Sequence, residues 1–299
     1  MKIDTKKELL NEFGSNIFFD YDLKKRNWFN IGGKCKIFFK AENLKKLINF
    51  LKKINKDEKI FILGAGSNTL ISDNVFNGVV IKFSKYFNNI SLHGKDIIIA
   101  GSAVLDKTLS EFAIENELSG FEFLSCIPGT VGGGIKMNAG CFDREFKDIL
   151  VSIQAIDKRG NIVTIPSKDM KFEYRKNNLP DELIFLSASF KGNKGKRDDI
   201  INKTKKLKAD KEKNQPTMIK TSGSTFKNPI SQTDKKVWQL IKESVPLDQN
   251  FGDACISSKH CNFFVNKGNA TFKDMCDLIN FVAEKVYKKT GIKLEKEIK

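Results

Sequence analysis

The chain has 299 residues, of which 40% are apolar, and a formal net charge of +16. This length allows two or three compact domains, and the composition excludes a disordered chain or a fibre. The charged opening, Met1–Lys7, does not fit a secretory signal peptide, and without an apolar run of about 18 residues we expect no membrane span.

Lysine supplies almost all of the positive charge, because only five arginines occur in the chain. Proteins that read bases in nucleic acids use arginine forks, so this composition argues against a nucleic-acid partner and suits an anionic small ligand. The six cysteines form no CxxC pair. Their spacing predicts neither a zinc site nor a disulfide scaffold, and it favours the reduced cytoplasm.

The first stretch of the chain, residues 1–83, alternates strand and helix patterns. Apolar residues recur at helical spacing over residues 44–54. A buried-type strand over residues 60–63 then runs directly into the loop Gly64–Asn68, and residues 79–81 form a further strand pattern. This order predicts a small unit of strands and helices with a glycine loop at the end of one strand.

The second stretch, residues 84–193, is richer in strand patterns. Residues 97–99 predict a strand, and an apolar face over residues 105–113 predicts a helix. Two strand patterns within residues 151–165 flank a polar turn and predict a hairpin. A last strand is predicted over residues 183–190.

The third stretch, residues 194–299, opens with a lysine-rich segment that we expect to be an exposed helix up to Asn214. The final helix begins with a capping-box pattern at Thr271 and Asp274 and ends at Gly291. Together the three stretches predict an α+β protein.

Three glycine-rich segments mark the candidate binding loops. Gly64–Asn68 follows a buried strand, but it lacks the features of a Walker loop or of the Rossmann fingerprint, so by itself it is equally compatible with a tight turn. Pro128–Gly134 is too glycine-dense for a helix or strand interior, which predicts close approach by another backbone or a flat ligand. Asn30–Gly33 is the third segment. Three such loops suggest a large bound dinucleotide.

These loops resemble a known class of flavoprotein. FAD domains of the vanillyl-alcohol-oxidase (PCMH) type carry, in the same order, loops similar to Asn30–Gly33, Gly64–Leu70, Ile127–Gly133 and Met137–Gly140. More narrowly, the chain resembles the family of UDP-N-acetylenolpyruvoylglucosamine reductases. Three later segments carry that narrower resemblance: Tyr174–Arg175, Gly223–Pro229 and Leu294–Ile298. The chain lacks the long insertion with a mobile tyrosine that marks one subclass, so it resembles the shorter subclass.

The resemblance implies an α+β fold with two FAD-binding subdomains, residues 1–83 and 84–193. Residues 194–299 would form an α+β substrate-binding domain whose last residues return to the active site. FAD is expected to bind without a covalent bond. The implied cofactor positions are Asn30, Gly32, Gly33, Gly64, Ala65, Gly66, Ser67, Asn68, Leu70, Ile127, Pro128, Gly129, Thr130, Gly132 and Gly133.

The implied activity is the NADPH-dependent reduction of the enolpyruvyl group of a UDP-sugar, giving UDP-N-acetylmuramate for peptidoglycan synthesis. Hydride transfer to C3 leaves an enolate-like intermediate, whose carboxylate must be stabilised and whose C2 must receive a proton. The expected enzyme is a cytoplasmic monomer. Another FAD-dependent oxidase or dehydrogenase of the same fold, or a non-enzymatic binding protein, is the alternative.

Three residues match the catalytic positions of that family. Arg175 would clamp the substrate carboxylate, Glu297 would polarise it from the opposite side, and Ser224 would donate the proton to C2. Each has a plainer reading, respectively a surface salt bridge, a solvated residue of the tail and a serine that caps a turn. Tyr174 and Asn228 match substrate-binding positions.

Two positions depart from the family pattern. Asn214 stands where relatives carry a lysine, which leaves open which basic residue contacts the UDP phosphates. Cys126 stands where glycine is common. No metal cluster is expected, since His93 and His260 are the only histidines.

Overall fold

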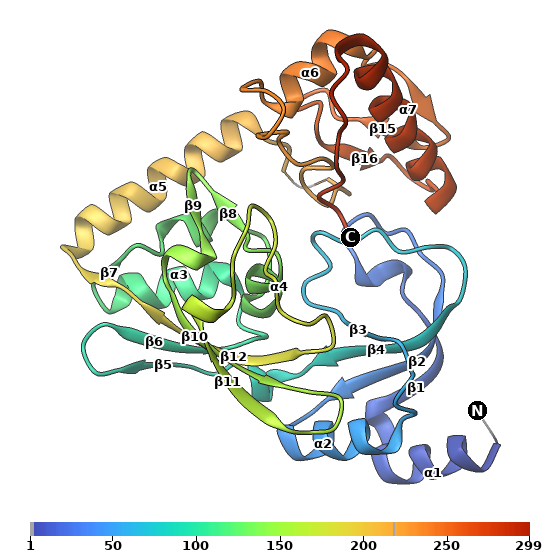
Figure 1. Cartoon of the computed structure of the whole chain (residues 1–299), viewed down its shortest axis with the longest axis vertical. Helices are drawn as coiled ribbons and strands as arrows, with labels where there is room; N and C mark the ends of the chain where they lie inside the picture. Colours follow the sequence, from blue (N-terminus) through green and yellow to red (C-terminus); the bar gives the residue numbers. More distant parts are fainter. Residues whose placement is uncertain (1–2, 218) are drawn as a thin grey trace. The chain divides into compact units, whose positions relative to one another are not determined.

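The computed structural model describes residues 3–217 and 219–299 (Figure 1). Met1 and Lys2, which open the charged N-terminal segment, lie outside the described residues. No helix within the described ranges has both the length and the apolar character needed to cross a membrane.

The chain divides into two compact units. The first runs up to Tyr21 and adds Cys35–Ala65 and Asn77–Ala209, and the second comprises Asp22–Lys34, Gly66–Phe76 and Asp210–Lys299. Two short segments from the N-terminal part of the sequence therefore pack with the C-terminal residues. The division into functional domains 1–83, 84–193 and 194–299 stays a prediction.

The first unit begins with a four-stranded sheet in the order β1-β2-β4-β3. Its strands are β1 (Ile17–Asp22), β2 (Lys34–Ala41), β3 (Ile60–Ile62) and β4 (Phe76–Phe83), with β3 parallel to β4. Two helices accompany it, α1 (Ile3–Phe13) and α2 (Leu44–Lys53). The helix predicted over residues 44–54 is confirmed, and the Asn43 side chain caps its start by accepting a hydrogen bond from the Lys46 amide.

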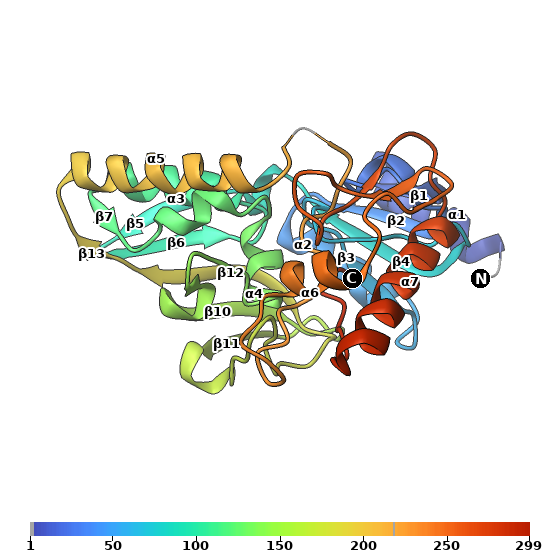
Figure 2. The same cartoon turned by 90° about the horizontal axis from the view of Figure 1, so that it is seen from above.

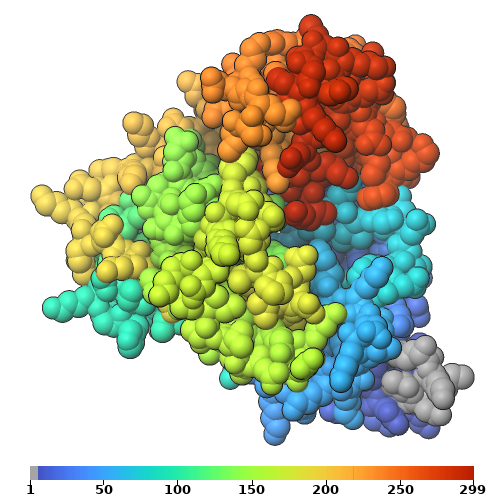
Figure 3. All heavy atoms as spheres, viewed as in Figure 1, coloured from blue at the N-terminus to red at the C-terminus, as the bar shows by residue number. Residues whose placement is uncertain are grey.

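A five-stranded antiparallel sheet completes most of the first unit. Its order is β11-β10-β12-β6-β5, formed by β5 (Ile90–His93), β6 (Ile97–Gly101), β10 (Leu150–Ile156), β11 (Ile162–Pro166) and β12 (Ile184–Lys191). The predicted hairpin is confirmed as β10–β11, with Ile156 opposite Ile162. Strand β11 lies at the sheet edge, and most of its residues are exposed (Figure 3).

Helices α3 (Asp106–Glu115) and α4 (Val131–Lys136) cover one face of this sheet (Figure 1). Short pairings join β7 (Leu118–Ser119) to β13 (Asn193–Lys194) and β8 (Gly140–Cys141) to β9 (Arg144–Glu145). The predicted lysine-rich helix is α5 (Arg197–Asn214), and its first part runs alongside α3 (Figure 2).

The expectation that Pro128–Gly134 avoids helix was wrong, because α4 contains Gly132, Gly133 and Gly134. A side chain at Gly134 would place its Cβ 2.2 Å from the Phe146 ring, and one at Gly132 would lie 3.0 Å from Ser102. Close packing of the helix backbone against these neighbours therefore outweighs the low helix propensity of glycine. At Gly132 the neighbours include the Ser102 backbone carbonyl, so the predicted close approach of another backbone is confirmed there, whereas the neighbour at Gly134 is the Phe146 side chain.

The second unit is built on α6 (Val237–Ser244), α7 (Phe272–Thr290) and a small antiparallel sheet. That sheet has the order β14-β15-β16, with β14 (Asn250–Phe251), β15 (Ala254–Ile256) and β16 (Phe264–Asn266). The predicted capping box is confirmed: Thr271 and Asp274 exchange hydrogen bonds between side chains and amides at 3.1 and 2.9 Å. Gly291 ends α7 in the left-handed conformation, at φ +72°.

Candidate active site

The first glycine loop, Gly64–Asn68, follows β3 and carries a run of backbone amides that donate no hydrogen bond within the described part of the chain. The amides of residues 64–68 donate no hydrogen bond to any described residue. Gly66 has φ +70°, and a Cβ there would lie 2.3 Å from the Arg26 carbonyl oxygen, so only glycine fits. Consecutive unpaired N–H groups of this kind are suited to binding an anionic group such as a diphosphate.

The second glycine loop lies close to Gly64, the first residue of the first loop, within the first unit. The Thr130 hydroxyl oxygen is 2.8 Å from the position that a Gly64 side chain would occupy. The amides of Gly129, Val131 and Gly132 are used inside the protein, donating to the carbonyls of Ile127, Val104 and Ser102 at 2.9–3.0 Å. Among the described residues of this loop, only the Thr130 and Gly133 amides are thus left to contact a ligand.

The third segment, Asn30–Gly33, packs against the chain itself. The Gly33 amide donates to the Ser72 carbonyl at 2.8 Å, and a Cβ at Gly33 would lie 2.2 Å from the Asp73 carbonyl oxygen. Asn30 adopts φ +54°. Close approach of backbone therefore accounts for Gly33, while the cofactor role of this segment stays a prediction.

Sequence reasoning missed a buried carboxyl group beside the second loop. Asp106 opens α3, is 0% exposed, and neither carboxyl oxygen has a hydrogen-bond partner among the described residues. Its Oδ2 lies 2.6 Å from the position of a Cβ on Gly129. Burial raises the pKa of the Asp106 carboxyl well above its ordinary value. A buried carboxyl group whose charged form is disfavoured therefore lies beside the predicted cofactor loop.

This buried acid makes stability depend on pH. As pH rises above the ordinary aspartate pKa, the unfolded chain loses the Asp106 proton before the folded chain does. The free energy of unfolding therefore falls with rising pH. We expect the melting temperature of Asp106→Asn relative to the parent protein to be higher at pH 8 than at pH 5. The exposed Asp248→Asn variant is the control. Identical pH profiles for the parent and Asp106→Asn would contradict the assignment.

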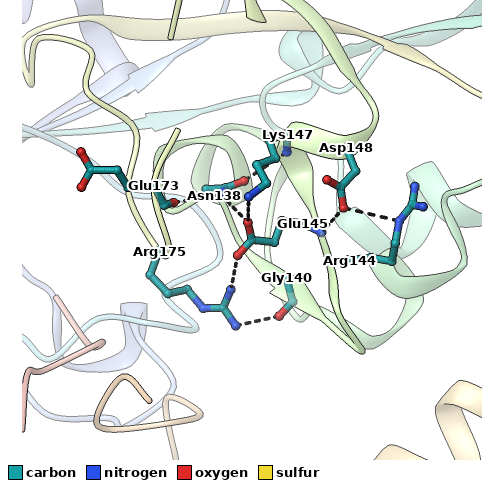
Figure 4. Close-up of polar contacts among 8 residues, drawn as sticks. All are labelled: Asn138, Gly140, Arg144, Glu145, Lys147, Asp148, Glu173 and Arg175. Atoms are coloured by element: carbon teal, nitrogen blue, oxygen red, sulfur yellow. Dashed lines mark hydrogen bonds and ion pairs between the residues drawn. The ribbon is translucent and has the colours of Figure 1, made fainter. Parts of the chain in front are cut away.

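Arg175 is held by polar contacts in the first unit (Figure 4). Its Nη2 donates to the Gly140 carbonyl at 3.0 Å, and its Nη1 lies 3.5 Å from Glu145 Oε1. The guanidinium also stacks over the Tyr174 ring at 4.9 Å. The side chain is only 16% exposed. A flexible surface salt bridge, the plainer reading of this residue, does not describe that environment.

Ser224 and Glu297 are brought together in the second unit. Ser224 pairs with Phe263 in an isolated β-bridge, which fixes the start of its loop. The Glu297 amide donates to the Thr225 carbonyl at 2.8 Å, and Phe226 pairs with Lys296. Glu297 is therefore part of a strand-like pairing beside the serine loop and not a solvated residue of the tail.

The other edge of this terminal segment bonds to the chain that follows the first glycine loop. The Lys299 amide donates to the Asn68 carbonyl at 3.0 Å, and the Leu70 amide donates to the Lys299 carbonyl at 2.6 Å. The Asn68 side-chain amide donates to the Glu297 carbonyl at 3.2 Å. Three predicted site residues, Asn68, Leu70 and Glu297, thus share one hydrogen-bonded segment.

The remaining predicted residues have more local roles. Asn228 Oδ1 accepts a hydrogen bond from the Val237 amide at 3.0 Å and so caps the start of α6. Asn214 Nδ2 donates to the Asp210 carbonyl within α5. The Nδ1 atom of His260 accepts from the Asn262 amide at 3.3 Å, and burial lowers the pKa of this imidazole. The described part of the chain contains no group of three or more side chains that could hold a metal ion.

Comparison with known proteins covers the whole chain. A family profile described as an FAD binding domain matches residues 35–166, and one described as the UDP-N-acetylenolpyruvoylglucosamine reductase C-terminal domain matches residues 215–299. The chain is 65% identical to the UDP-N-acetylenolpyruvoylglucosamine reductase of Pelagibacter ubique over 299 residues, which cover 100% of this chain and 99% of that protein.

Two further proteins with the same enzyme name are also similar to this chain. Identity to the enzyme of the same name from Rickettsia typhi is 46% over 280 residues, covering 94% of each chain. The crystal structure of UDP-N-acetylenolpyruvylglucosamine reductase from Thermus caldophilus matches with a TM-score of 0.81 and 29% identity, covering 95% of this chain and 97% of that one. With an α+β fold, an FAD binding domain and this similarity along its whole length, the chain belongs to the UDP-N-acetylenolpyruvoylglucosamine reductase family.

Proposed function

We propose that this protein reduces the enolpyruvyl group of UDP-N-acetylenolpyruvoylglucosamine to give UDP-N-acetylmuramate, using NADPH and bound FAD. The observation that carries the proposal is the backbone pairing that sets Glu297 beside the Ser224 loop. In a chain that matches the family over its whole length, this pairing supports an acid and a hydroxyl donor acting at one place.

The first glycine loop fits a dinucleotide cofactor. The unpaired amides of residues 64–68 would hold the FAD diphosphate, together with the Thr130 and Gly133 amides of the neighbouring loop. Lys82, whose Nζ donates to the Gly64 carbonyl, would add positive charge there. When bound there, FAD would supply the redox chemistry that carries a hydride from NADPH to C3 of the enolpyruvyl group.

Side chains of the protein would stabilise the charge on the substrate carboxylate and deliver the proton to C2. Arg175 presents a planar guanidinium to the substrate carboxylate, on which negative charge develops after hydride transfer. Ser224 donates a proton to C2. A serine hydroxyl is a weak acid, but the carbanion-like intermediate is a strong base and the loop would hold the two together. Glu297 would polarise the carboxylate from the other side.

The proposal also covers the residues that contact the substrate, the cellular compartment and the oligomeric state. Tyr174 and Asn228 would contact the UDP-sugar, Asn228 through the amide nitrogen that its capping bond to Val237 does not use. The reaction would take place in the cytoplasm, in agreement with a cysteine pattern that suits a reducing compartment. We propose a monomer.

The cofactor can be tested directly. We expect one FAD per chain, released into the supernatant when the purified protein is precipitated with acid, because no histidine lies in the glycine loops to form a covalent bond. Flavin retained in the pellet would contradict this, and Cys126→Ser would then test the thiol that directly precedes the Ile127–Gly133 loop. A colourless protein that FAD cannot reconstitute would overturn the proposed function.

The substrate distinguishes the proposal from its alternative. After anaerobic reduction by NADPH, the enolpyruvyl UDP-sugar should reoxidise the flavin, with UDP-N-acetylmuramate as the product. Another FAD-dependent oxidase or dehydrogenase of the same fold would be reduced but would not transfer its electrons to this substrate.

A further inference from the structure

One motif of the sequence has no role in the proposed chemistry, Met137–Gly140. Within it, Asn138 is fully buried and adopts φ +41°. Its Nδ2 donates to Glu145 Oε2 at 2.9 Å and to the Glu173 carbonyl at 3.0 Å, while its Oδ1 accepts from the Lys147 amide at 3.1 Å (Figure 4). The carboxamide is held at both ends, so it fixes the position of the Glu145 carboxylate.

The two oxygens of that carboxylate face different cations. Glu145 Oε1 lies 3.5 Å from Arg175 Nη1, and Oε2 lies 2.8 Å from Lys147 Nζ. The Glu145 side chain is 15% exposed, so solvent screens these pairs less than it would at the surface. Since Lys147 shares the carboxylate, Glu145 does not by itself neutralise Arg175.

The same short hairpin supplies a second contact to Arg175. The Gly140 carbonyl accepts from Nη2 at 3.0 Å, so both terminal nitrogens of the guanidinium are held and its plane is defined. A Cβ at Gly140 would lie 2.4 Å from the Arg144 carbonyl oxygen and 2.8 Å from Glu145 Cγ. Glycine at this position therefore allows β8 and β9 to approach closely enough to form the hairpin.

Arg175 lies in a turn, so no helix or strand fixes its backbone. Arg175 lies outside every helix and strand and has φ +56°, a conformation that L-residues other than glycine adopt only at a cost. A long arginine side chain on such a turn loses considerable rotamer freedom when it binds a ligand. Contacts made before the substrate arrives reduce that loss.

We propose that Asn138, the Gly140 carbonyl and Glu145 form a mount that positions Arg175 for the substrate carboxylate. Glu145 is the positioning residue, since it acts through Arg175 and does not touch the substrate. This inference rests on the proposed function and deepens it by assigning the Asn138–Gly140 segment to substrate binding instead of the cofactor.

Glu145→Gln tests the mount, because it keeps the size of the side chain and removes the charge that faces Arg175. We expect the dissociation constant of the enolpyruvyl UDP-sugar, measured by calorimetry on the oxidised protein, to rise about 10-fold. Flavin reoxidation by this substrate should slow about 10- to 100-fold. Flavin reduction by NADPH, FAD content and melting temperature should match the control.

Asp148→Asn is the matched control. Asp148 lies three residues further along, pairs with Arg144 at 3.5 Å and accepts from the Glu145 amide at 2.9 Å, a contact that asparagine can keep. It loses the same charge in the same hairpin region without a contact to Arg175. The proposal is overturned if the two variants behave alike, or if Glu145→Gln loses FAD, since Glu145 would then serve folding.

A double-mutant cycle decides whether Glu145 acts through Arg175. In an Arg175→Lys background, Glu145→Gln should change substrate affinity and reoxidation by less than about 3-fold, because the group that it positions is already lost. An undiminished effect in that background would show an independent role and overturn the proposal. If the parent protein binds the substrate but is not reoxidised by it, the proposed function fails first and separately.

Discussion

Replacing Ser224 with alanine should leave one half-reaction intact and nearly abolish the other. Anaerobic flavin reduction by NADPH requires no proton on C2, so its rate should stay close to that of the parent protein. Reoxidation by the enolpyruvyl UDP-sugar should slow by about 10²–10⁴, the usual span for a positioned general acid. Stopped-flow absorbance of the flavin measures both rates on the same preparation.

Ser222→Ala is the control for this experiment. Ser222 is buried two residues earlier in the same loop, and its hydroxyl donates to the Thr69 carbonyl at 3.3 Å, which gives it a structural role. If both variants slow both half-reactions equally, the loop only supports the fold. Normal reoxidation in Ser224→Ala would assign the proton to another group.

Arg175→Lys should lower turnover by about 10²–10³, as expected for the loss of one preorganised electrostatic donor. Lysine keeps the positive charge but has no planar fork, so it cannot hold Gly140 and Glu145 at two nitrogens while it faces a carboxylate. The loss should fall on reoxidation by the substrate, with FAD content unchanged. Steady-state kinetics and the flavin spectrum provide both measurements.

Arg144→Lys is the matched substitution. Arg144 lies in the same region but is 48% exposed and pairs with Asp148, so this change should alter turnover by less than about 3-fold. Parent-like turnover in Arg175→Lys would indicate that Arg175 only forms a structural ion pair with Glu145.

The predicted local structure depended on short-range patterns. The helix that begins at Thr271 and ends at Gly291 is confirmed because its signals, a capping box, an apolar face and a left-handed glycine, act within a few residues of the chain. The β10–β11 hairpin is confirmed for the same reason, since a polar turn between two apolar runs brings only neighbouring residues together.

Helix α4 shows where such patterns fail. Its three consecutive glycines argue against a helix, yet the Phe146 ring leaves no room for a side chain at Gly134, and Ser102 lies close to Gly132. Phe146 lies 12 residues from Gly134 and Ser102 lies 30 residues from Gly132, so no local propensity includes these partners.

By itself, the sequence determined the α+β class, the cofactor loops as candidates and the family resemblance, since each depends on residue types in a fixed order. Only the tertiary structure decided that the segment ending in Lys299 pairs with Asn68 and with the Ser224 loop, and that Glu145 meets Arg175. These contacts join residues as much as 231 positions apart in the chain, as for Lys299 and Asn68. Backbone groups at such separations carry no residue-specific pattern, so their partners become known only when the fold brings them together.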